Sequence, residues 1–199
     1  MRLAALVPVV ASVALAGPVR MTPTPGYVLR VCRTSALIAP VCPRKLPYID
    51  HLPSEHAYDL VGLCRPGRSG CAGVQWDDLE IEASGGGGAP PVFTHIAIFA
   101  GNLSHAFPFA YPTHGSALRL RDGLVARPRS RALFFGRFAW GGERGTLVLA
   151  PGYPGGGEQG DHLIFRWRRG PVEYAVGLHA WEPLTRTAAT LHAIVESTG

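Results

Sequence analysis

Acidic and imidazole side chains gather in the sequence around residue 160. Glu158, Asp161 and His162 lie within a span of five residues, and His179 follows on the strand that we expect to pair with this segment. Carboxylates and imidazoles that converge near the mouth of a loop can hold a metal ion or exchange protons with a substrate. The candidate catalytic residues are therefore Asp161, His162 and His179.

The remaining histidines form no local metal motif. The chain has 8 His but no H-E-x-x-H or H-x-H arrangement, and it has no G-x-S-x-G nucleophile turn. His95 lies within an apolar run and is expected to be a hydrogen-bonded core residue. His105 and His114 flank a segment rich in aromatic residues and proline. These patterns indicate no metal site and no cofactor.

Arginine is concentrated between residues 119 and 144. This segment contains seven arginines and only two acidic residues, Asp122 and Glu143. In an exported protein such a segment suits anionic lipid headgroups or cell-wall polymers, and we expect no nucleic acid partner. A solvated arginine surface is the alternative. The aromatic segment nearby either packs back on the sheet or forms a contact surface. The candidate binding residues are Arg127, Arg129, Arg131, Phe107, Phe109 and Tyr111.

Four cysteines lie in the first half of the chain, and an even number in an exported protein indicates disulfides. Three pairings are open. We favour Cys32–Cys42 and Cys64–Cys71, because each pair closes a short loop that contains proline or glycine. A zinc site requires closely spaced cysteine pairs such as C-x2-C, and this spacing does not occur.

The N-terminus resembles a secretory signal peptide over residues 1–16. Arg2 precedes an apolar run that ends in Ala14-Leu15-Ala16, which predicts cleavage after Ala16 and a secreted or extracytoplasmic protein. The run is too short to span a bilayer, and we expect no transmembrane span after cleavage. Residues 17–30, with three prolines, are expected to form a mobile, extended arm or linker.

The rest of the chain, residues 31–199, has the length and composition of one globular domain. The whole sequence of 199 residues is 47% hydrophobic and 17% charged, with a formal net charge of +5. A disordered chain would contain less apolar surface and more charge. Residues 31–75 hold the cysteines among turn-forming residues and are expected to be stapled loops. Residues 76–199 are expected to form a sheet and a helix.

Alternating and apolar segments predict an antiparallel meander. Residues 76–83 alternate apolar and acidic side chains, as in a strand with one solvated face. Residues 92–100 are apolar on both faces, which is typical of a central strand. Further strands are expected at residues 117–121, 133–140 and 145–150.

The C-terminal segment predicts a hairpin at residues 162–181 and then a helix. A turn centred on Arg169-Gly170 would place Phe165 opposite Tyr174, Arg166 opposite Glu173 and His162 opposite Gly177. His179 would then lie one diagonal step from His162. After Pro183, one helical stripe contains Leu184, Ala188, Leu191 and Val195. A mostly antiparallel sheet with a C-terminal helix packed on it is an α+β fold.

Residues 160–199 resemble a part of known exported bacterial domains. The stretches Asp161–Trp167 and Val172–Gly177, followed by a helix that ends in Ile194-Val195-Glu196-Ser197, are similar to the closing hairpin and helix of domains related to lipoprotein carriers and sigma-factor regulators. The resemblance implies a half-barrel sheet that binds a lipid or a protein and performs no catalysis.

Two functions follow as hypotheses. The first is an exported, non-catalytic module that binds an anionic or hydrophobic component of the cell envelope, or a partner protein, through the arginine-rich segment and the aromatic loop. The second is a small secreted hydrolase or metal-dependent enzyme with its site near Asp161 and His162. An enzyme requires two or more of the candidate acids and histidines to converge within hydrogen-bond reach.

Overall fold

The computed structural model describes residues 19–49, 57–61, 76–83, 95–103, 118–119, 125–129, 132–150, 160–180 and 183–199, the side chains of 61, 118–119 and 125–129 excepted. Within these ranges the main element is a 9-stranded sheet in which every neighbouring pair is antiparallel. Its strands are β3 (Tyr58–Val61), β4 (Trp76–Ala83), β5 (His95–Gly101), β6 (Leu118–Arg119), β7 (Val125–Arg129), β8 (Ala132–Trp140), β9 (Glu143–Leu149), β10 (His162–Arg169) and β11 (Val172–His179).

The order of the strands is β3-β4-β5-β11-β10-β9-β8-β7-β6, so the sheet consists of two meanders that meet between β5 and β11. The expected strands and the α+β class are confirmed. The expected meander is interrupted at one point, because β5 pairs with β11 and not with β6. The apolar sequence of β5 explains its place, since β5 lies in the sheet interior between β4 and β11.

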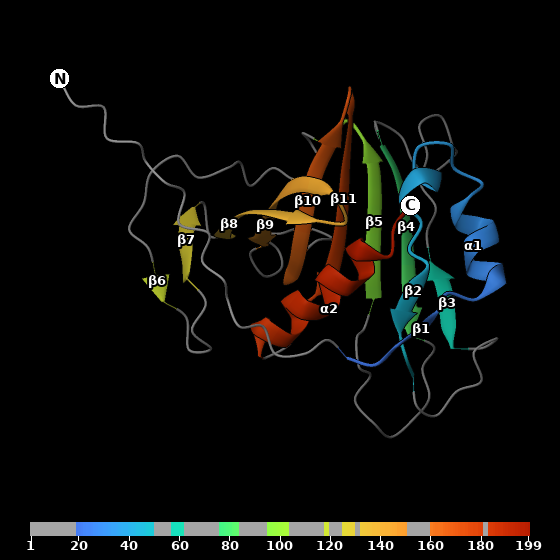
Figure 1. The fold of residues 1–199 in the computed structure, drawn as a ribbon, viewed down its shortest axis with the longest axis horizontal. Helices are drawn as coiled ribbons and strands as arrows, with labels where there is room; N and C mark the ends of the chain where they lie inside the picture. Colours follow the sequence, from blue (N-terminus) through green and yellow to red (C-terminus); the bar gives the residue numbers. More distant parts are fainter. Residues whose placement is uncertain are drawn as a thin grey trace.

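Helix α2 (Leu184–Glu196) packs on one face of this sheet, against β10 and β11 (Figure 1). Pro183 has an extended backbone just before the helix, where its missing N–H costs nothing. The predicted stripe is confirmed, because Leu184, Ala188, Leu191 and Val195 are all buried. Their partners in the core come from alternate strand positions, among them Ile96, Ile98, Leu163, Phe165, Val176 and Leu178.

The N-terminal segment forms a second unit that packs into the same core. It consists of β1 (Met21–Pro23), α1 (Gly26–Cys32), a 3-10 turn at Ala39–Val41 and β2 (Lys45–Pro47), and β1 pairs with β2. Val28 is fully buried in the core. We expected an extended arm over residues 17–30, but from Met21 onward the chain forms β1 and α1. From residue 31 to residue 47 short elements alternate with turns that the Cys32–Cys42 disulfide links, as expected of stapled loops. The helix forms because it buries an apolar side chain that an extended arm would leave in water.

The predicted Cys32–Cys42 disulfide is confirmed, with a Cα–Cα distance of 6.0 Å. It links the end of α1 to the residue that follows the 3-10 turn. Both cysteines are buried. The second expected pair, Cys64–Cys71, and the expected signal peptide lie outside the described residues.

The β10–β11 hairpin forms as predicted, but its register differs by two residues. Trp167 lies opposite Tyr174, and His162 lies opposite His179. The turn is Gly170-Pro171, with Gly170 at a φ of 55°. A glycine at positive φ followed by a residue with the φ of proline suits a two-residue type II′ turn, which is why the turn is not centred on Arg169-Gly170. A shift of two residues keeps each side chain on its predicted face.

None of the helices in the described part of the chain is long and apolar enough to cross a membrane.

Candidate metal centre

Three adjacent strands each place a histidine in the same row across the sheet. His162 begins β10 and lies directly opposite His179, the last residue of β11. Leu178 pairs with Ile96, so the next position on each strand brings His179 beside His95, the first residue of β5. The ring centroids lie 4.4 Å apart for His95 and His162, 5.6 Å for His95 and His179, and 5.2 Å for His162 and His179.

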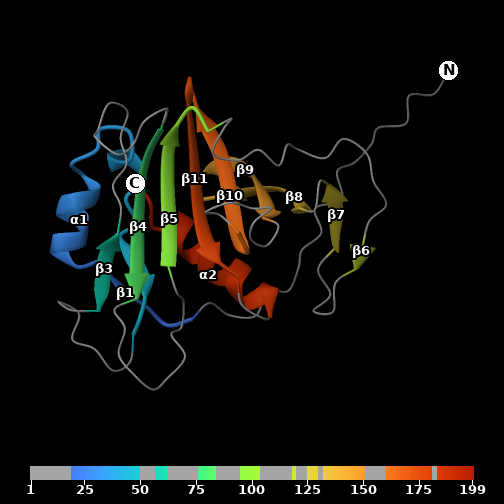
Figure 2. The same ribbon diagram turned by 180° about the vertical axis from the view of Figure 1, so that it is seen from behind.

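The histidine row, defined as His95, His162 and His179, lies on the sheet face turned away from α2. The neighbouring residues Ile96, Leu163 and Leu178 point into the core that contains α2, and side chains alternate between the two faces of a strand. Figure 2 shows the sheet from the side opposite α2. On this face Ala97, Ile164 and Ala175 belong to a second, smaller apolar cluster.

The geometry suits one metal ion shared by the three imidazoles. One ring nitrogen from each histidine lies within 4.8 Å of the other two. Nitrogen ligands at about 2.0 to 2.1 Å from a tetrahedral zinc ion lie roughly 3.3 Å from one another. The ring nitrogens therefore lie at most about 1.5 Å further apart than the ligands of a bound tetrahedral ion.

The His162 ring makes a hydrogen bond of the kind found in metal-bound histidines. Its Nδ1 lies 2.9 Å from the carbonyl oxygen of Gly160. A carbonyl only accepts hydrogen bonds, so in this contact Nδ1 carries the hydrogen, and in the neutral ring the lone pair is then on Nε2. Metal-bound histidines donate their second ring N–H to a carbonyl or carboxylate in the same way. The His162 side chain is fully buried, which keeps this orientation fixed.

Asp161 has a backbone role beside the row. It adopts a φ of 59°, the left-handed region that aspartate tolerates better than most residues. Its carbonyl accepts a hydrogen bond of 2.7 Å from the N–H of Ala180, which ties the start of β10 to the end of β11. The Asp161 side chain is exposed, and its carboxylate does not belong to the group of ligand atoms.

The electrostatics around His95 favour a neutral ring. Burial lowers the pKa of His95, the neighbouring His179 lowers it further, and Glu82 raises it. A neutral imidazole has the free lone pair that metal binding requires. Glu82 lies directly opposite His95 on β4, so a carboxylate extends the row at the β5 end.

The structure brings together two of the three predicted catalytic residues, His162 and His179, and it adds His95. His95 is not the hydrogen-bonded core residue that we expected from its apolar neighbours, because it is partly exposed at the start of β5. Glu158, His105, His114, Arg131, Phe107, Phe109 and Tyr111 lie outside the described residues. For Arg127 and Arg129 only the backbone, in β7, is described. Binding through these residues stays a prediction.

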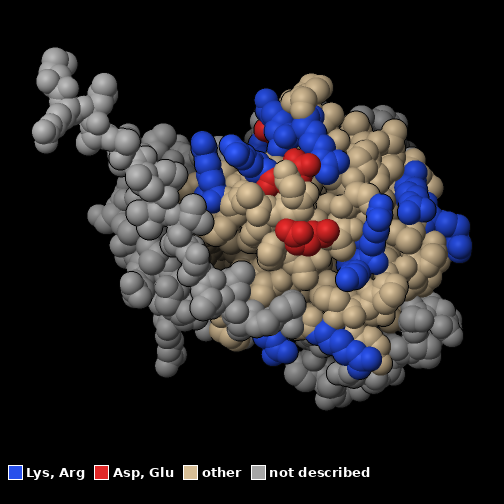
Figure 3. Space-filling model, viewed as in Figure 1, with Lys and Arg blue, Asp and Glu red and all other residues tan. Residues whose placement is uncertain are grey.

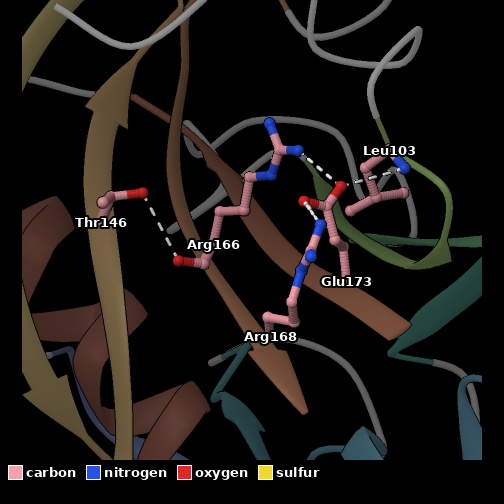
Figure 4. A network of polar contacts seen from close by, with 5 residues as sticks. All are labelled: Leu103, Thr146, Arg166, Arg168 and Glu173. Carbon is pink, nitrogen blue, oxygen red and sulfur yellow. Dashed lines mark hydrogen bonds and ion pairs between the residues drawn. The ribbon is translucent and has the colours of Figure 1, made fainter. Parts of the chain in front are cut away.

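A polar network lies on the same face, nearer the hairpin turn (Figure 4). Glu173 accepts hydrogen bonds of 2.6 Å from Arg166, 2.8 Å from Arg168 and 3.3 Å from the backbone N–H of Leu103. Burial raises the pKa of Glu173, but the hydrogen bonds from the two arginines outweigh that effect and lower it. The network therefore contains an ionised carboxylate held between two guanidinium groups.

Compared with known protein families, curated proteins and solved structures, the chain matches none.

Proposed function

We propose that this protein binds a divalent transition metal ion of the zinc class through His95, His162 and His179. The proposal rests on three ring nitrogens, one from each of three adjacent strands, that lie within 4.8 Å of one another. Imidazole ligands suit zinc, copper and nickel, whereas magnesium and calcium prefer oxygen ligands. The hydrogen bond from His162 to Gly160 supports the same assignment, because it presents Nε2 to the ion.

Cobalt binding tests this proposal. Co(II) replaces zinc and gives visible absorption bands that are strong only for a four- or five-coordinate ion. We expect the purified protein to bind one Co(II), and zinc to displace it. His179→Ala should weaken binding roughly a hundredfold or more, because loss of a ligand costs more than the 10- to 100-fold typical of an outer partner.

The matched control is His192→Ala. His192 is partly exposed on α2 and contacts Glu196 at 3.0 Å, away from the row. Because His162 is fully buried and its replacement can unfold the protein, the partly exposed His95 and His179 are the residues to change. Equal Co(II) affinity in His95→Ala, His179→Ala and the original protein would reject the site.

Metal-dependent hydrolysis is the second candidate function. Three protein ligands leave a fourth position on a tetrahedral ion, where zinc lowers the pKa of a bound water to near neutrality. In that case His95, His162 and His179 would hold the ion, and the ion would supply an activated water for the hydrolysis of an ester to an acid and an alcohol. Hydrolysis of p-nitrophenyl acetate by the zinc-loaded protein, and its loss in His179→Ala, tests this function. Turnover that persists in the variant contradicts it.

The protein is proposed to act outside the cytoplasm. The signal-like residues 1–16 support this location, and so does the Cys32–Cys42 disulfide, because disulfides persist in oxidising compartments. N-terminal sequencing of secreted protein should give Gly17 as the first residue. An intact N-terminus on secreted material would contradict cleavage after Ala16.

A further inference from the structure

Four arginines share one patch of the sheet face that also holds the histidine row. Arg137 of β8 and Arg166 of β10 both lie opposite Thr146 of β9, so these three residues form a row across three strands. Arg144 lies two residues before Thr146 on β9, and Arg168 lies two residues after Arg166 on β10. Alternation along each strand puts all four on the same face. We call Arg137, Arg144, Arg166 and Arg168 the arginine cluster.

The cluster is distant from the histidine row. Arg166 follows His162 by four residues on β10, which corresponds to roughly 13 Å along an extended strand. A single phosphate or sulfate group is therefore too small to contact both a metal ion on the histidine row and the exposed arginines. The cluster is a separate feature from the proposed metal site.

The positive charge of the cluster is only partly neutralised. Glu173 pairs with Arg166 and Arg168, whose side chains are 13% and 63% exposed. Arg137 and Arg144 are exposed, and no carboxylate among the described residues forms an ion pair with them. Within the described part of the chain, four guanidinium groups paired with one carboxylate give the cluster a net charge of +3.

The neighbouring Arg169 lies on the opposite face of the sheet, where its charge is paired. Arg169 alternates with Arg168 and pairs with Glu143 at 2.7 Å. Its charge is therefore matched one to one, whereas no described carboxylate pairs with Arg137 or Arg144. Figure 3 views the molecule from the α2 side, where Lys and Arg side chains lie close to Asp and Glu side chains near the top of the view; the sheet face of the arginine cluster is on the far side. Like charges on neighbouring strands destabilise a sheet, and a bound anion removes that cost.

The arrangement suits an extended anion. Arg137, Arg144 and Arg168 lie on three successive strands, which span about 10 Å at the usual strand separation. Each guanidinium can bind a phosphate or sulfate group through two hydrogen bonds. Ala139, opposite Arg144, is exposed but small, so it offers little apolar surface for insertion into a bilayer. The exposed surface of the cluster thus favours a charged polymer over a lipid surface.

We propose that Arg137, Arg144 and Arg168 bind a linear polyanion that bears phosphate or sulfate groups. Glu173 holds Arg168 in place, because it accepts a hydrogen bond from Arg168. Glu173 is itself fixed, since it is largely buried and also accepts a hydrogen bond from the largely buried Arg166. This binding is independent of the proposed metal function and is measured in the presence of EDTA.

Two probes distinguish the anions: long-chain polyphosphate and dextran sulfate, with neutral dextran as the negative control. The double variant Arg137→Gln/Arg144→Gln should bind whichever polymer is recognised at least about tenfold more weakly at 0.15 M salt, where the Debye length is about 8 Å. The matched control is Arg33→Gln/Arg186→Gln, which removes two exposed arginines elsewhere and changes the net charge equally. That control should bind as the original protein does.

Three results would overturn the proposal. Equal loss in the two double variants would show that net charge alone drives binding. Binding to phosphatidylglycerol vesicles without binding to either polymer would assign the cluster to a membrane surface. Binding to none of these probes would remove the cluster as an anion site, whatever the outcome of the cobalt titration.

Discussion

His162 and His179 face each other across the β10–β11 ladder, with ring centroids 5.2 Å apart. The two-residue Gly170-Pro171 turn sets this pairing, because a turn displaced by one residue would place His162 opposite Gly177. The hairpin alone thus supplies two ligands, and β5 adds the third when it pairs with β11.

Metal binding should stabilise the folded protein. The three ligands come together only when β5, β11 and β10 pair, so zinc binds the folded state in preference to the unfolded chain. Free zinc at 100 times its dissociation constant adds about 2.7 kcal/mol, which raises Tm by roughly 5 to 10 °C for a domain of this size. Thermal unfolding in zinc and in EDTA measures the shift. His179→Ala should show none, and a shift retained in that variant would place the zinc elsewhere.

Glu82 should strengthen metal binding from beside His95. Its carboxylate lies on the adjacent strand and in the same row, where a negative charge attracts the ion and can hydrogen-bond a ligand ring. Replacing Glu82 by Gln keeps the shape and removes the charge, and we expect roughly tenfold weaker Co(II) binding in a competition titration. Glu80→Gln is the control, because Glu80 lies on the same strand and face, one row further from the histidines. Equal effects of the two substitutions would show only a general electrostatic contribution.

Acid should weaken the Glu173 network. The pKa of Glu173 is lowered in the folded state, so its contribution to stability is fully present above the unfolded value, about 4.5, and is lost as the pH falls through the folded value. Glu173→Gln should cost about 1 to 3 kcal/mol at pH 7, because charged hydrogen bonds are removed. Urea unfolding from pH 7 to pH 3 should show this difference narrowing. The control is Asp59→Asn, which removes a carboxylate at an exposed position on β3, outside the network, and should change the free energy of unfolding at pH 7 less than Glu173→Gln does.

Removal of the Cys32–Cys42 disulfide should destabilise the N-terminal unit. The bond closes a loop with a sequence separation of 10, which in the chain-entropy model contributes roughly 2 to 3 kcal/mol. Cys32→Ala/Cys42→Ala should lower the free energy of unfolding by that amount. Urea denaturation measures it. Cys32 and Cys42 belong to the core on the α2 side of the sheet, whereas the histidine row lies on the other face. Co(II) affinity should therefore not change at a temperature where the variant stays folded, and a large change would link the two regions.

Local patterns in the sequence predicted the elements that local forces shape. The alternation in β4, the apolar run of β5 and the helical stripe of α2 are properties of consecutive residues, and all three elements form where expected. The Cys32–Cys42 bond was also predictable, because its loop is short. The helix α1 was not, since it is only 7 residues long and owes its stability to the burial of Val28 in the core.

The candidate site itself was decided by tertiary structure. The residue types around His162 and His179 indicated acid, base or metal chemistry, but nothing in the residues around His95 connects it with them. That connection comes from the pairing of β5 with β11, two strands far apart in the chain whose contact depends on packing of the whole sheet. The arginine cluster has the same origin, because Arg137, Arg144 and Arg168 become neighbours only when three strands align in register. Sequence by itself determines which face a strand residue occupies; the long-range pairing of strands determines which residues share that face side by side.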